Sequence, residues 1–296
     1  MRLLIETLGF GVFSGTVIAL GAVGFTVQFG ISNVLNVAYG TFLTLAAYLG
    51  YLLAISGLNL WLCIPLVGIA TGVLLVAFNR LLTRPLGRRG GGFVTVLIAT
   101  VWAGIIIQYV IILVAGPSTF TYPVSNGTTF RFADFVLTGT QLIIIGGALV
   151  VMLAYHALLT RTQLGRAMRA TSVNRVVAQS CGIRTERVTD AAWLISGFLC
   201  GIAGVVLAAT TTTFDSTLGT TFLIYMIAAA VLGGIGQPYG AMVGGLLIGL
   251  STQLVGAYSS PAYEDVAAFV ILVCLLLVRP RGLFGSASSV GRRLAA

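Results

Sequence analysis

The sequence predicts an all-α polytopic membrane protein, because apolar stretches long enough to cross a bilayer recur along its whole length. Of its 296 residues, 58% are hydrophobic and only 8% are charged, and the mean hydropathy is +1.05, which leaves too little polar surface for a soluble globule. A hydrocarbon core of about 30 Å is crossed by about 20 residues of α-helix. The alternation of period two that a membrane β-barrel requires is absent, so the spans are predicted to be helices.

Roughly nine hydrophobic segments are expected to form these helices, within a range of about 8–10 spans. In chain order they are Leu4–Val27, Val37–Ile55, Leu60–Phe78, Phe93–Ala115, Gln141–Leu159, Val188–Thr210, Phe222–Leu232, Ala241–Tyr258 and Val266–Val278. Met1–Phe10 carries Arg2 and Glu6, and no small-residue cleavage site follows a short apolar core, so a secretory signal peptide is not expected. The first segment is therefore expected to remain in the mature protein.

Arginine-rich loops predict the orientation, since short positively charged loops stay in the cytoplasm. Three such clusters fall on one side of the predicted spans, at Arg80–Arg89, Arg161–Arg187 and Arg279–Arg293. The C-terminus is thus expected in the cytoplasm and the N-terminus outside, and a re-entrant segment near Asn33 would reverse the side of the N-terminus. The loop Pro117–Thr140 and the turn at Glu264 and Asp265 are expected to face outward. The arginine-rich loops on the inner side account for the net charge of +9, so nucleic-acid binding is not indicated.

The residue types that are missing exclude several chemistries. The chain has no lysine, which excludes a lysine-containing phosphate-binding loop and lysine Schiff-base chemistry. His156 is the only histidine, so a multi-histidine zinc site is excluded, and we interpret this residue as a satisfied interfacial histidine rather than a proton relay. The cysteines lack C-x-x-C spacing and are interpreted as small buried residues: Cys63, Cys181, Cys200 and Cys274. No catalytic residue, metal site or cofactor is predicted in this chain.

Polar uncharged residues indicate a path for a small polar solute. Asp190 is the one candidate for the intramembrane carboxylate that an ion-coupled carrier commonly keeps, and its place in "VTDAAW" favours helix capping as the simpler role. The residues predicted to line the translocation path are Asn33, Asn36, Tyr39, Gln108 and Tyr225. Interhelical hydrogen bonding is an equal alternative for the first three.

Two stretches interrupt the helical pattern in a similar way. "FGISNVLNVAYG" (Phe29–Gly40) and "LGGIGQPYGAMVGG" (Leu232–Gly245) each set a Gly-Ile step beside an amide residue and close on Tyr-Gly or contain it. Paired interruptions in a membrane protein predict a discontinuous helix at a translocation site. Glycines at small-x-x-x-small spacing, such as Gly240 and Gly244, are expected to serve close helix packing.

The segment Arg161–Arg187 combines six arginines with helical periodicity. Leu164, Ala167, Met168 and Thr171 share one face, and Val173, Val176, Val177 and Ser180 continue the stripe. We predict a short amphipathic helix on the inner side, which either lies on anionic lipid or docks into a groove of a cytoplasmic partner.

The motifs together resemble one transporter family. "GRAMRATSVNRVVAQSCGIRTERV", "GIAGVVLA" and "AAAVLGGIGQPYGAMVGGLLIGL", with "GTVIALGAVGFTVQFGISNVLNVAYG" upstream, resemble the permease subunit of branched-chain amino-acid-type ABC importers from about Gly15 to Phe284. The resemblance implies one transmembrane permease domain of type II-like architecture over residues 1–296, with a coupling segment at 161–187 and an arginine-rich cytoplasmic tail at 279–296. The residues expected to couple to the ATPase are Gly165, Arg166, Ala167, Ala170, Gly182 and Ile183.

The partners implied by the resemblance are a second, homologous permease, in a homo- or heterodimer, two ATP-binding subunits that hold ATP and Mg, and an extracytoplasmic solute-binding protein. Tyr225 stands near the place of a lysine in relatives, and Tyr39 replaces a histidine, so selectivity is expected to differ. Leucine-like amino acids, urea and short amides are not distinguished by the sequence. The alternative function is a self-sufficient secondary transporter or channel; an enzyme is not expected, since no nucleophile–base pair is found.

Overall fold

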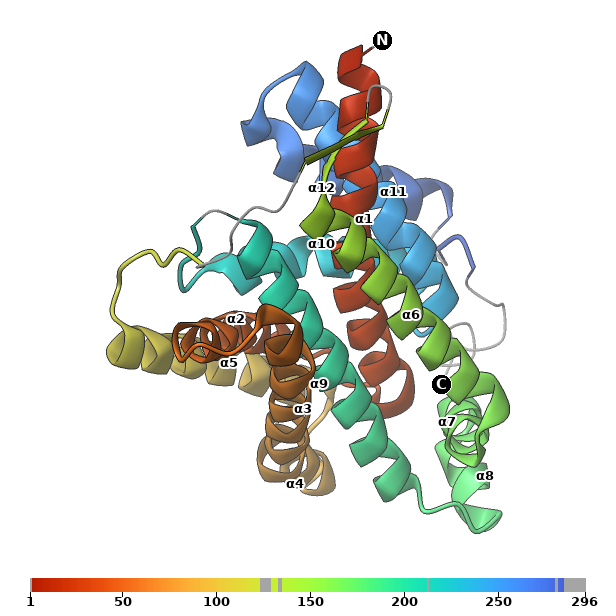
Figure 1. The fold of residues 1–296 in the computed structure, drawn as a ribbon. Helices are drawn as coiled ribbons and strands as arrows, with labels where there is room; N and C mark the ends of the chain where they lie inside the picture. Colours follow the sequence, from red (N-terminus) through yellow and green to blue (C-terminus); the bar gives the residue numbers. More distant parts are fainter. Residues whose placement is uncertain (1, 123–128, 133–134, 212, 280–281, 285–296) are drawn as a thin grey trace. The chain divides into compact units, whose positions relative to one another are not determined.

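The computed structural model describes residues 2–122, 129–132, 135–211, 213–279 and 282–284, and it is almost entirely helical (Figure 1). The one departure from an all-α fold in this part of the chain is a short antiparallel hairpin of β1 (Thr129–Phe132) and β2 (Phe135–Thr138), which pairs Thr129 with Thr138. The hairpin lies in the predicted outward loop. Two polar residues of that loop, Asn126 and Asp134, lie outside the described residues.

All nine predicted segments are helices. They are α1 (Arg2–Ser32), α2 (Tyr39–Ile55), α3 (Leu60–Phe78), α5 (Phe93–Ala115), α6 (Gly139–Arg161), α9 (Thr185–Thr210), α10 (Leu218–Gly233), α11 (Pro238–Tyr258) and α12 (Glu264–Val278). Most extend a few residues beyond the apolar stretch, because capping residues and polar first turns continue the helix where hydropathy has already fallen. Shorter elements complete the described chain: the π-helix η1 (Asn79–Thr83), α4 (Arg84–Arg88), α7 (Gln163–Val173), α8 (Arg175–Ser180) and the 3₁₀-helix η2 (Pro261–Tyr263).

Six of the described helical stretches are long and apolar enough to cross a membrane. They are Thr7–Ser32, Leu60–Arg88, Phe93–Ala115, Gly139–Arg161, Thr185–Thr210 and Pro238–Tyr258, and α2 and α10 are shorter apolar helices. On α3, α5 and α6 most of the residues are not buried although they are apolar, and some are almost fully exposed, for example Leu113 at 86% and Leu153 at 66%. Exposed apolar faces of this extent are expected of helices that contact lipid or another subunit.

The chain divides into two compact units that are interleaved in the sequence. Unit 1 comprises Met1–Ile31, Gly127–Thr189 and Tyr225–Ala296, and unit 2 comprises Ser32–Asn126 and Asp190–Ile224. The helices α1, α9 and α10 each pass from one unit into the other along the chain. The prediction of a single permease domain concerns the working unit of the transporter and stays a prediction.

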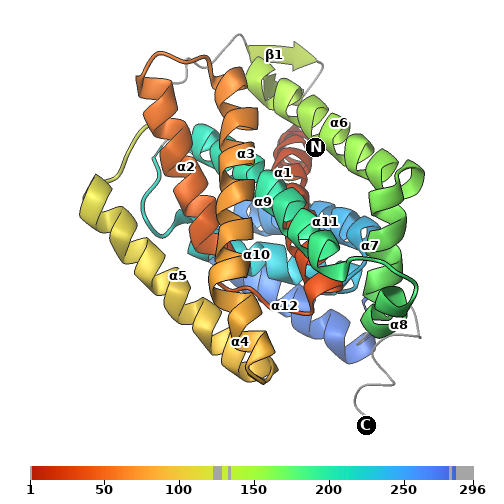
Figure 2. The ribbon, with the colours of Figure 1, turned by 90° about the horizontal axis from the view of Figure 1, so that it is seen from below.

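Unit 2 is held together by α2, which lies against both α3 and α5 (Figure 2). An aromatic cluster of Tyr48, Tyr51, Phe120, Tyr122 and Phe214 closes one end of this unit, with ring centroids 5.1–6.1 Å apart. The hydroxyl of Tyr122 donates to the carbonyl oxygen of Ala47 at 3.1 Å and joins the loop to α2. Gly197 and Gly201 of α9 meet α3, where an added Cβ would lie 2.6 Å from the Cα of Gly72 and 2.7 Å from that of Gly68.

Unit 1 is built on close backbone contact between α1 and α11. A Cβ on Gly15 would lie 2.9 Å from the Cα of Leu246, and a Cβ on Gly245 would lie 2.5 Å from the Cα of Ala19. The α10–α11 turn is equally tight, since Gly240 faces the carbonyl group of Gly233. The prediction that the regularly spaced glycines serve helix packing is therefore confirmed in both units.

Candidate translocation path and coupling segment

The first predicted interruption lies between α1 and α2. Helix α1 ends at Ser32, Asn33 adopts a left-handed backbone with φ of 53°, and helical structure resumes at Tyr39. Asparagine accepts this conformation more readily than most residues. Thr100 of α5 contacts the open backbone: its hydroxyl accepts from the amide of Val37 at 3.3 Å, and its hydrogen is shared between the carbonyl oxygens of Leu97 at 2.8 Å and Leu35 at 3.3 Å. The predicted break near Asn33 is confirmed.

The three residues predicted at this break have different surroundings. Asn33 is exposed, whereas Asn36 and Tyr39 are fully buried. The hydroxyl of Tyr39 donates to the carbonyl oxygen of Ser196 on α9 at 3.2 Å, and the Cys200 thiol donates to the carbonyl oxygen of Tyr39 at 3.6 Å. Neither Oδ1 nor Nδ2 of Asn36 has a hydrogen-bond partner among the described residues. Tyr39 thus connects two helices, and Asn36 keeps its hydrogen-bonding capacity unused.

The other two predicted path residues belong to other helices, α5 and α10. Gln108 is half-buried on α5, about two turns beyond Thr100 in the same unit. Tyr225 belongs to unit 1, where its hydroxyl donates to the carboxylate of Asp265 at the start of α12. Burial raises the pKa of the neighbouring Glu264 carboxyl, and the charge of Asp265 raises it further. The structure therefore brings Asn33, Asn36 and Tyr39 to one break and gives Tyr225 an acidic partner.

The second predicted interruption separates α10 from α11. Gly234 and Gly236 have φ of 103° and 89°, which glycine adopts without a Cβ clash, and α11 then begins with Pro238 at its first position. Gly30, in the last turn of α1, faces this turn: a Cβ on Gly30 would lie 3.2 Å from the Cα of Gly236. The end of α1 that leads into the first break is thus in contact with the second break inside unit 1.

The basic segment forms two helices, α7 and α8, where a single short amphipathic helix was predicted. The reason is Asn174, whose Oδ1 accepts from the amides of Val176 and Val177 at 3.0 and 3.2 Å and so starts a second helix. Thr162 caps α7 in the same way, accepting from the amide of Gly165 at 3.0 Å. Arg169 donates to the carbonyl oxygen of Leu159 at 2.7 Å and satisfies the C-terminal end of α6.

The residues expected to couple to an ATPase differ in how deeply they are buried. Gly165 is buried, and a Cβ there would overlap the carbonyl oxygens of Leu158 and Leu159, so this glycine serves the α6–α7 turn. Arg166, Ala170 and Gly182 are exposed, and Ala167 and Ile183 are half-buried. Three apolar residues that were not predicted as site residues, Val173, Val176 and Val177, are 81%, 70% and 56% exposed. The apolar stripe that these residues form in the sequence is the signal that could have identified them as surface residues of the segment.

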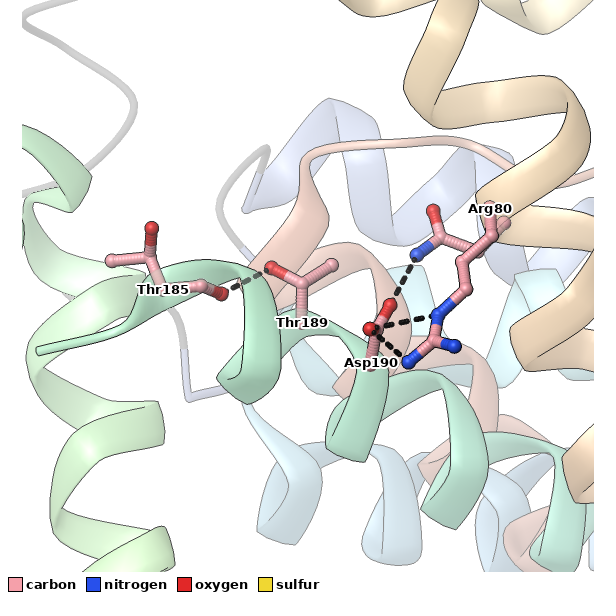
Figure 3. A network of polar contacts seen from close by, with 5 residues as sticks. Arg80, Thr185, Thr189 and Asp190 are labelled. Carbon is pink, nitrogen blue, oxygen red and sulfur yellow. Dashed lines mark hydrogen bonds and ion pairs between the residues drawn. The ribbon is translucent and has the colours of Figure 1, made fainter.

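Asp190 does not cap a helix, because α9 begins five residues earlier, at Thr185 (Figure 3). Its Oδ2 accepts from Nε and Nη2 of Arg80 at 3.0 and 2.8 Å, and its Oδ1 accepts from Nδ2 of Asn79 at 3.2 Å. The hydroxyl of Thr83 donates to Oδ1 of Asn79 at 2.6 Å. The carboxylate therefore joins α9 to the π-helix η1 within unit 2, and the capping prediction is wrong.

The single histidine and the four cysteines differ in burial and in hydrogen bonding. Nδ1 of His156 is hydrogen-bonded to the hydroxyl of Tyr239 at 2.8 Å, which agrees with a satisfied interfacial histidine. Cys63 and Cys200 are buried as expected, whereas Cys181 and Cys274 are exposed, because each lies on a face that no other described element covers. Among the described residues no group of three or more His, Cys, Asp or Glu side chains could hold a metal ion. In the arginine-rich tail, Arg281, Arg292 and Arg293 lie outside the described residues.

Long apolar helices with two glycine- and asparagine-associated breaks define a helical integral membrane protein of the transport class. The profile of the family described as "Branched-chain amino acid transport system / permease component" matches residues 7–276, and the chain belongs to this family. The resemblance found in the sequence is thereby confirmed.

Individual relatives match over nearly the whole chain. The chain is 30% identical to the high-affinity branched-chain amino acid transport system permease protein LivH of Escherichia coli K12, over 93% of each chain. It is 29% identical to BraD of Pseudomonas aeruginosa, named for the same type of system, over 93% of this chain and 94% of BraD. It is 26% identical to the permease protein LivM of Salmonella typhimurium, over 88% of this chain and 66% of LivM. Among solved structures, PsaBC from Streptococcus pneumoniae in complex with Fab aligns over 96% of this chain and 92% of that chain, at 12% identity and a TM-score of 0.47.

Proposed function

We propose that this chain is the permease subunit of an ATP-driven importer and forms the translocation path for a branched-chain or other neutral amino acid, or a related small polar solute such as urea or a short amide. The family match over residues 7–276 is the observation that carries the proposal. The names of LivH and BraD, which refer to branched-chain amino acid transport, favour leucine-like solutes within this range. The interrupted helix with Asn33, Asn36 and Tyr39 is the proposed place of solute passage, with Gln108 and Tyr225 as further lining residues.

The working transporter is proposed to contain a second, homologous permease. Salmonella typhimurium has two permease proteins, LivH and LivM, that are both similar to this chain, which supports an assembly of two related permeases. Two ATP-binding subunits would supply ATP and Mg, since the chain has no lysine for a phosphate-binding loop of its own. A solute-binding protein on the outer face would deliver the solute. This arrangement requires α7 and α8 to lie in the cytoplasm with the C-terminus, and the N-terminus to lie outside.

The exposed side of α7 and α8 is proposed to contact the ATP-binding subunit. Val173, Val176 and Val177 present apolar surface beside the exposed Arg166 and Ala170. The opposite side of α7 is already used, since Met168 and Thr171 are buried and Gly165 lies against the last turn of α6. An apolar patch with a basic rim is suited to a groove in a partner with an acidic rim.

The experiment that tests the proposal compares proteoliposomes containing the full complex with proteoliposomes that lack the ATP-binding subunits. With ATP inside and loaded binding protein outside, the full complex is expected to accumulate radiolabelled L-leucine, and the incomplete one is not. Solute uptake by this chain alone along a proton or sodium gradient would contradict the proposal and establish a secondary transporter. Passive equilibration of solute through the chain alone would instead establish a channel.

A further inference from the structure

We infer that Asn36 and Trp193 form a recognition pair for the backbone groups of a zwitterionic amino acid, with Asn36 contacting both the ammonium and carboxylate groups and Trp193 the carboxylate. This inference rests on the proposed function, because it names the part of the solute that the path recognises. It adds Trp193 of α9, a residue that the sequence analysis did not single out. It also assigns to Asn36 a role different from those of Asn33 and Tyr39 at the same break.

The first observation is that both side chains are fully buried and have unused polar atoms. Asn36 and Trp193 are each 0% exposed. Oδ1 and Nδ2 of Asn36, and Nε1 of Trp193, have no hydrogen-bond partner among the described residues. A buried donor or acceptor without a partner is costly, so such groups are uncommon and call for a functional explanation. Asn36 and Trp193 belong to the same compact unit.

The second observation is the helix register, which places the two residues at the same end of one contact. Helices α2 and α9 run in the same direction, since Cys200 contacts Tyr39 at 3.6 Å and a Cβ on Gly204 would lie 2.5 Å from the carbonyl oxygen of Leu43. The Tyr39 hydroxyl reaches Ser196, one turn before Cys200 on α9. Asn36 lies in the turn just before α2, where its carbonyl oxygen accepts from the amide of Tyr39 at 3.3 Å. Continued backward, the same register places Asn36 near Gly197, about one turn of α9 after Trp193.

Ring contacts support this placement independently. The indole of Trp193 packs on Phe78 with centroids 6.3 Å apart, and Phe78 packs on Phe42 with centroids 5.2 Å apart. Phe42 lies in the first turn of α2, so the indole is held beside the helix end that carries the break. The apolar rings leave Nε1 as the one polar atom that Trp193 can offer to a solute.

The third observation is that the neighbouring polar groups are already engaged. Thr100 bonds to Leu35 and Val37, on either side of Asn36, and the Tyr39 hydroxyl bonds to Ser196. Asp190, three residues before Trp193, accepts from Arg80 and Asn79. The described network therefore fixes the backbone around Asn36 and leaves its amide for another molecule. A second permease cannot supply the partner to this arrangement, because Asn36 is covered by its own chain.

The unused atoms match the solute chemically. Oδ1 of Asn36 can accept from an ammonium group, and Nδ2 of Asn36 and Nε1 of Trp193 can both donate to a carboxylate. Neutral dipoles hold a zwitterion without a net charge mismatch and more weakly than charged side chains would, which suits a site that must release the solute after each cycle. The site is closed in this structure, so solute contact requires the path to open as it does in alternating access.

The experiment measures ATP-driven uptake of radiolabelled L-leucine by the reconstituted full complex with saturating binding protein. Asn36→Leu and Trp193→Phe are each expected to lower uptake by about tenfold or more, the effect of losing a hydrogen bond to a charged group. Tyr48→Phe is the matched control, because the Tyr48 hydroxyl is also buried and unpartnered among the described residues but lies in the aromatic cluster. Its uptake is expected to equal that of the unmodified protein.

Two further measurements separate recognition from structure. Melting temperatures of the Asn36→Leu and Tyr48→Phe complexes should be unchanged or higher, because each replacement removes buried polar atoms that lack partners. ATP hydrolysis stimulated by the loaded binding protein should persist in both recognition variants. Normal uptake by Asn36→Leu and Trp193→Phe, with or without a lower melting temperature, would overturn the inference and assign the polar atoms to buried water. Absence of ATP-driven uptake in the unmodified complex would instead overturn the proposed function.

Discussion

At the scale of single residues, the Asp190 carboxylate acts through partners that lie far away in the sequence. Arg80 and Asn79 precede it by 110 and 111 positions. A local reading of "VTDAAW" suggests a helix cap, because capping needs only neighbouring residues, whereas an ion pair depends on how α9 packs against η1. Asn36 could be assigned to the path from its place in the interrupted segment, but its lack of a partner became visible only with the neighbouring side chains in place.

We predict that Asp190→Ala destabilises the protein by about 1–3 kcal/mol, because it leaves the amide of Asn79 buried without its acceptor. Arg80→Gln should cost less than about 1 kcal/mol, since the Arg80 side chain is 59% exposed and solvent screens its ion pair. Unfolding of the purified protein in detergent, followed by melting or denaturant titration, gives both values. Equal losses in the two variants would show that the arginine, not Asn79, is the important partner.

At the scale of elements, the nine hydrophobic segments could be predicted because each carries its own signal of length and hydropathy. The helix ends could not, since caps such as Thr138, with its reciprocal bonds to Gln141, extend a helix beyond the apolar stretch. The split between α7 and α8 depends on a single Asn174 side chain turning back to two amides. The hairpin of β1 and β2 lies in a polar loop, where hydropathy does not distinguish a strand from an irregular segment.

We predict that Gly240→Ala destabilises the protein by about 1–3 kcal/mol, because its Cβ would overlap the carbonyl group of Gly233 and separate α10 from α11. Gly146→Ala in α6 is the matched control. A Cβ on Gly146 meets nothing within 4 Å, and alanine is the better helix former by up to about 1 kcal/mol.

Melting temperatures in detergent distinguish the two substitutions. Gly240→Ala should lower the melting temperature, and Gly146→Ala should leave it unchanged or raise it. A similar decrease in both variants would mean that glycine flexibility, rather than close approach of the two helices, is what this part of the chain requires.

At the scale of the whole molecule, the division into two units was not predicted, because each unit is assembled from segments that are distant in the sequence. Unit 1 takes its helices from the beginning, the middle and the end of the chain. Hydropathy and motif spacing are local measures and do not report which spans pack together. Membership of the permease family could be predicted, since its motifs are continuous stretches.

The proposed orientation gives a prediction for cysteine labelling. Cys181 is exposed at the end of α8, whereas Cys63 and Cys200 are buried, so Cys181 is the reactive thiol of a Cys274→Ala variant. With α8 in the cytoplasm, a membrane-impermeant maleimide should leave intact spheroplasts unlabelled and label inside-out vesicles. Additional Cys181→Ala should abolish labelling. Labelling of Cys181 in intact spheroplasts would show that the chain has the opposite orientation in the membrane.

The π-helix η1 has a consequence for the permitted length of the chain. Its i→i+5 hydrogen bonds accommodate one more residue than a regular helix, between α3 and α4. Deleting one residue within Asn79–Thr83 would let α3 continue smoothly into α4 as an ordinary α-helix. Deleting Leu81 or Leu82 would also rotate the residues that follow by about 100° around the helix axis and turn Thr83 away from Asn79, the partner of Asp190. A shorter, more regular helix would span the membrane equally well, but the hydroxyl of Thr83 would no longer hold the amide of Asn79 that donates to Asp190 on α9.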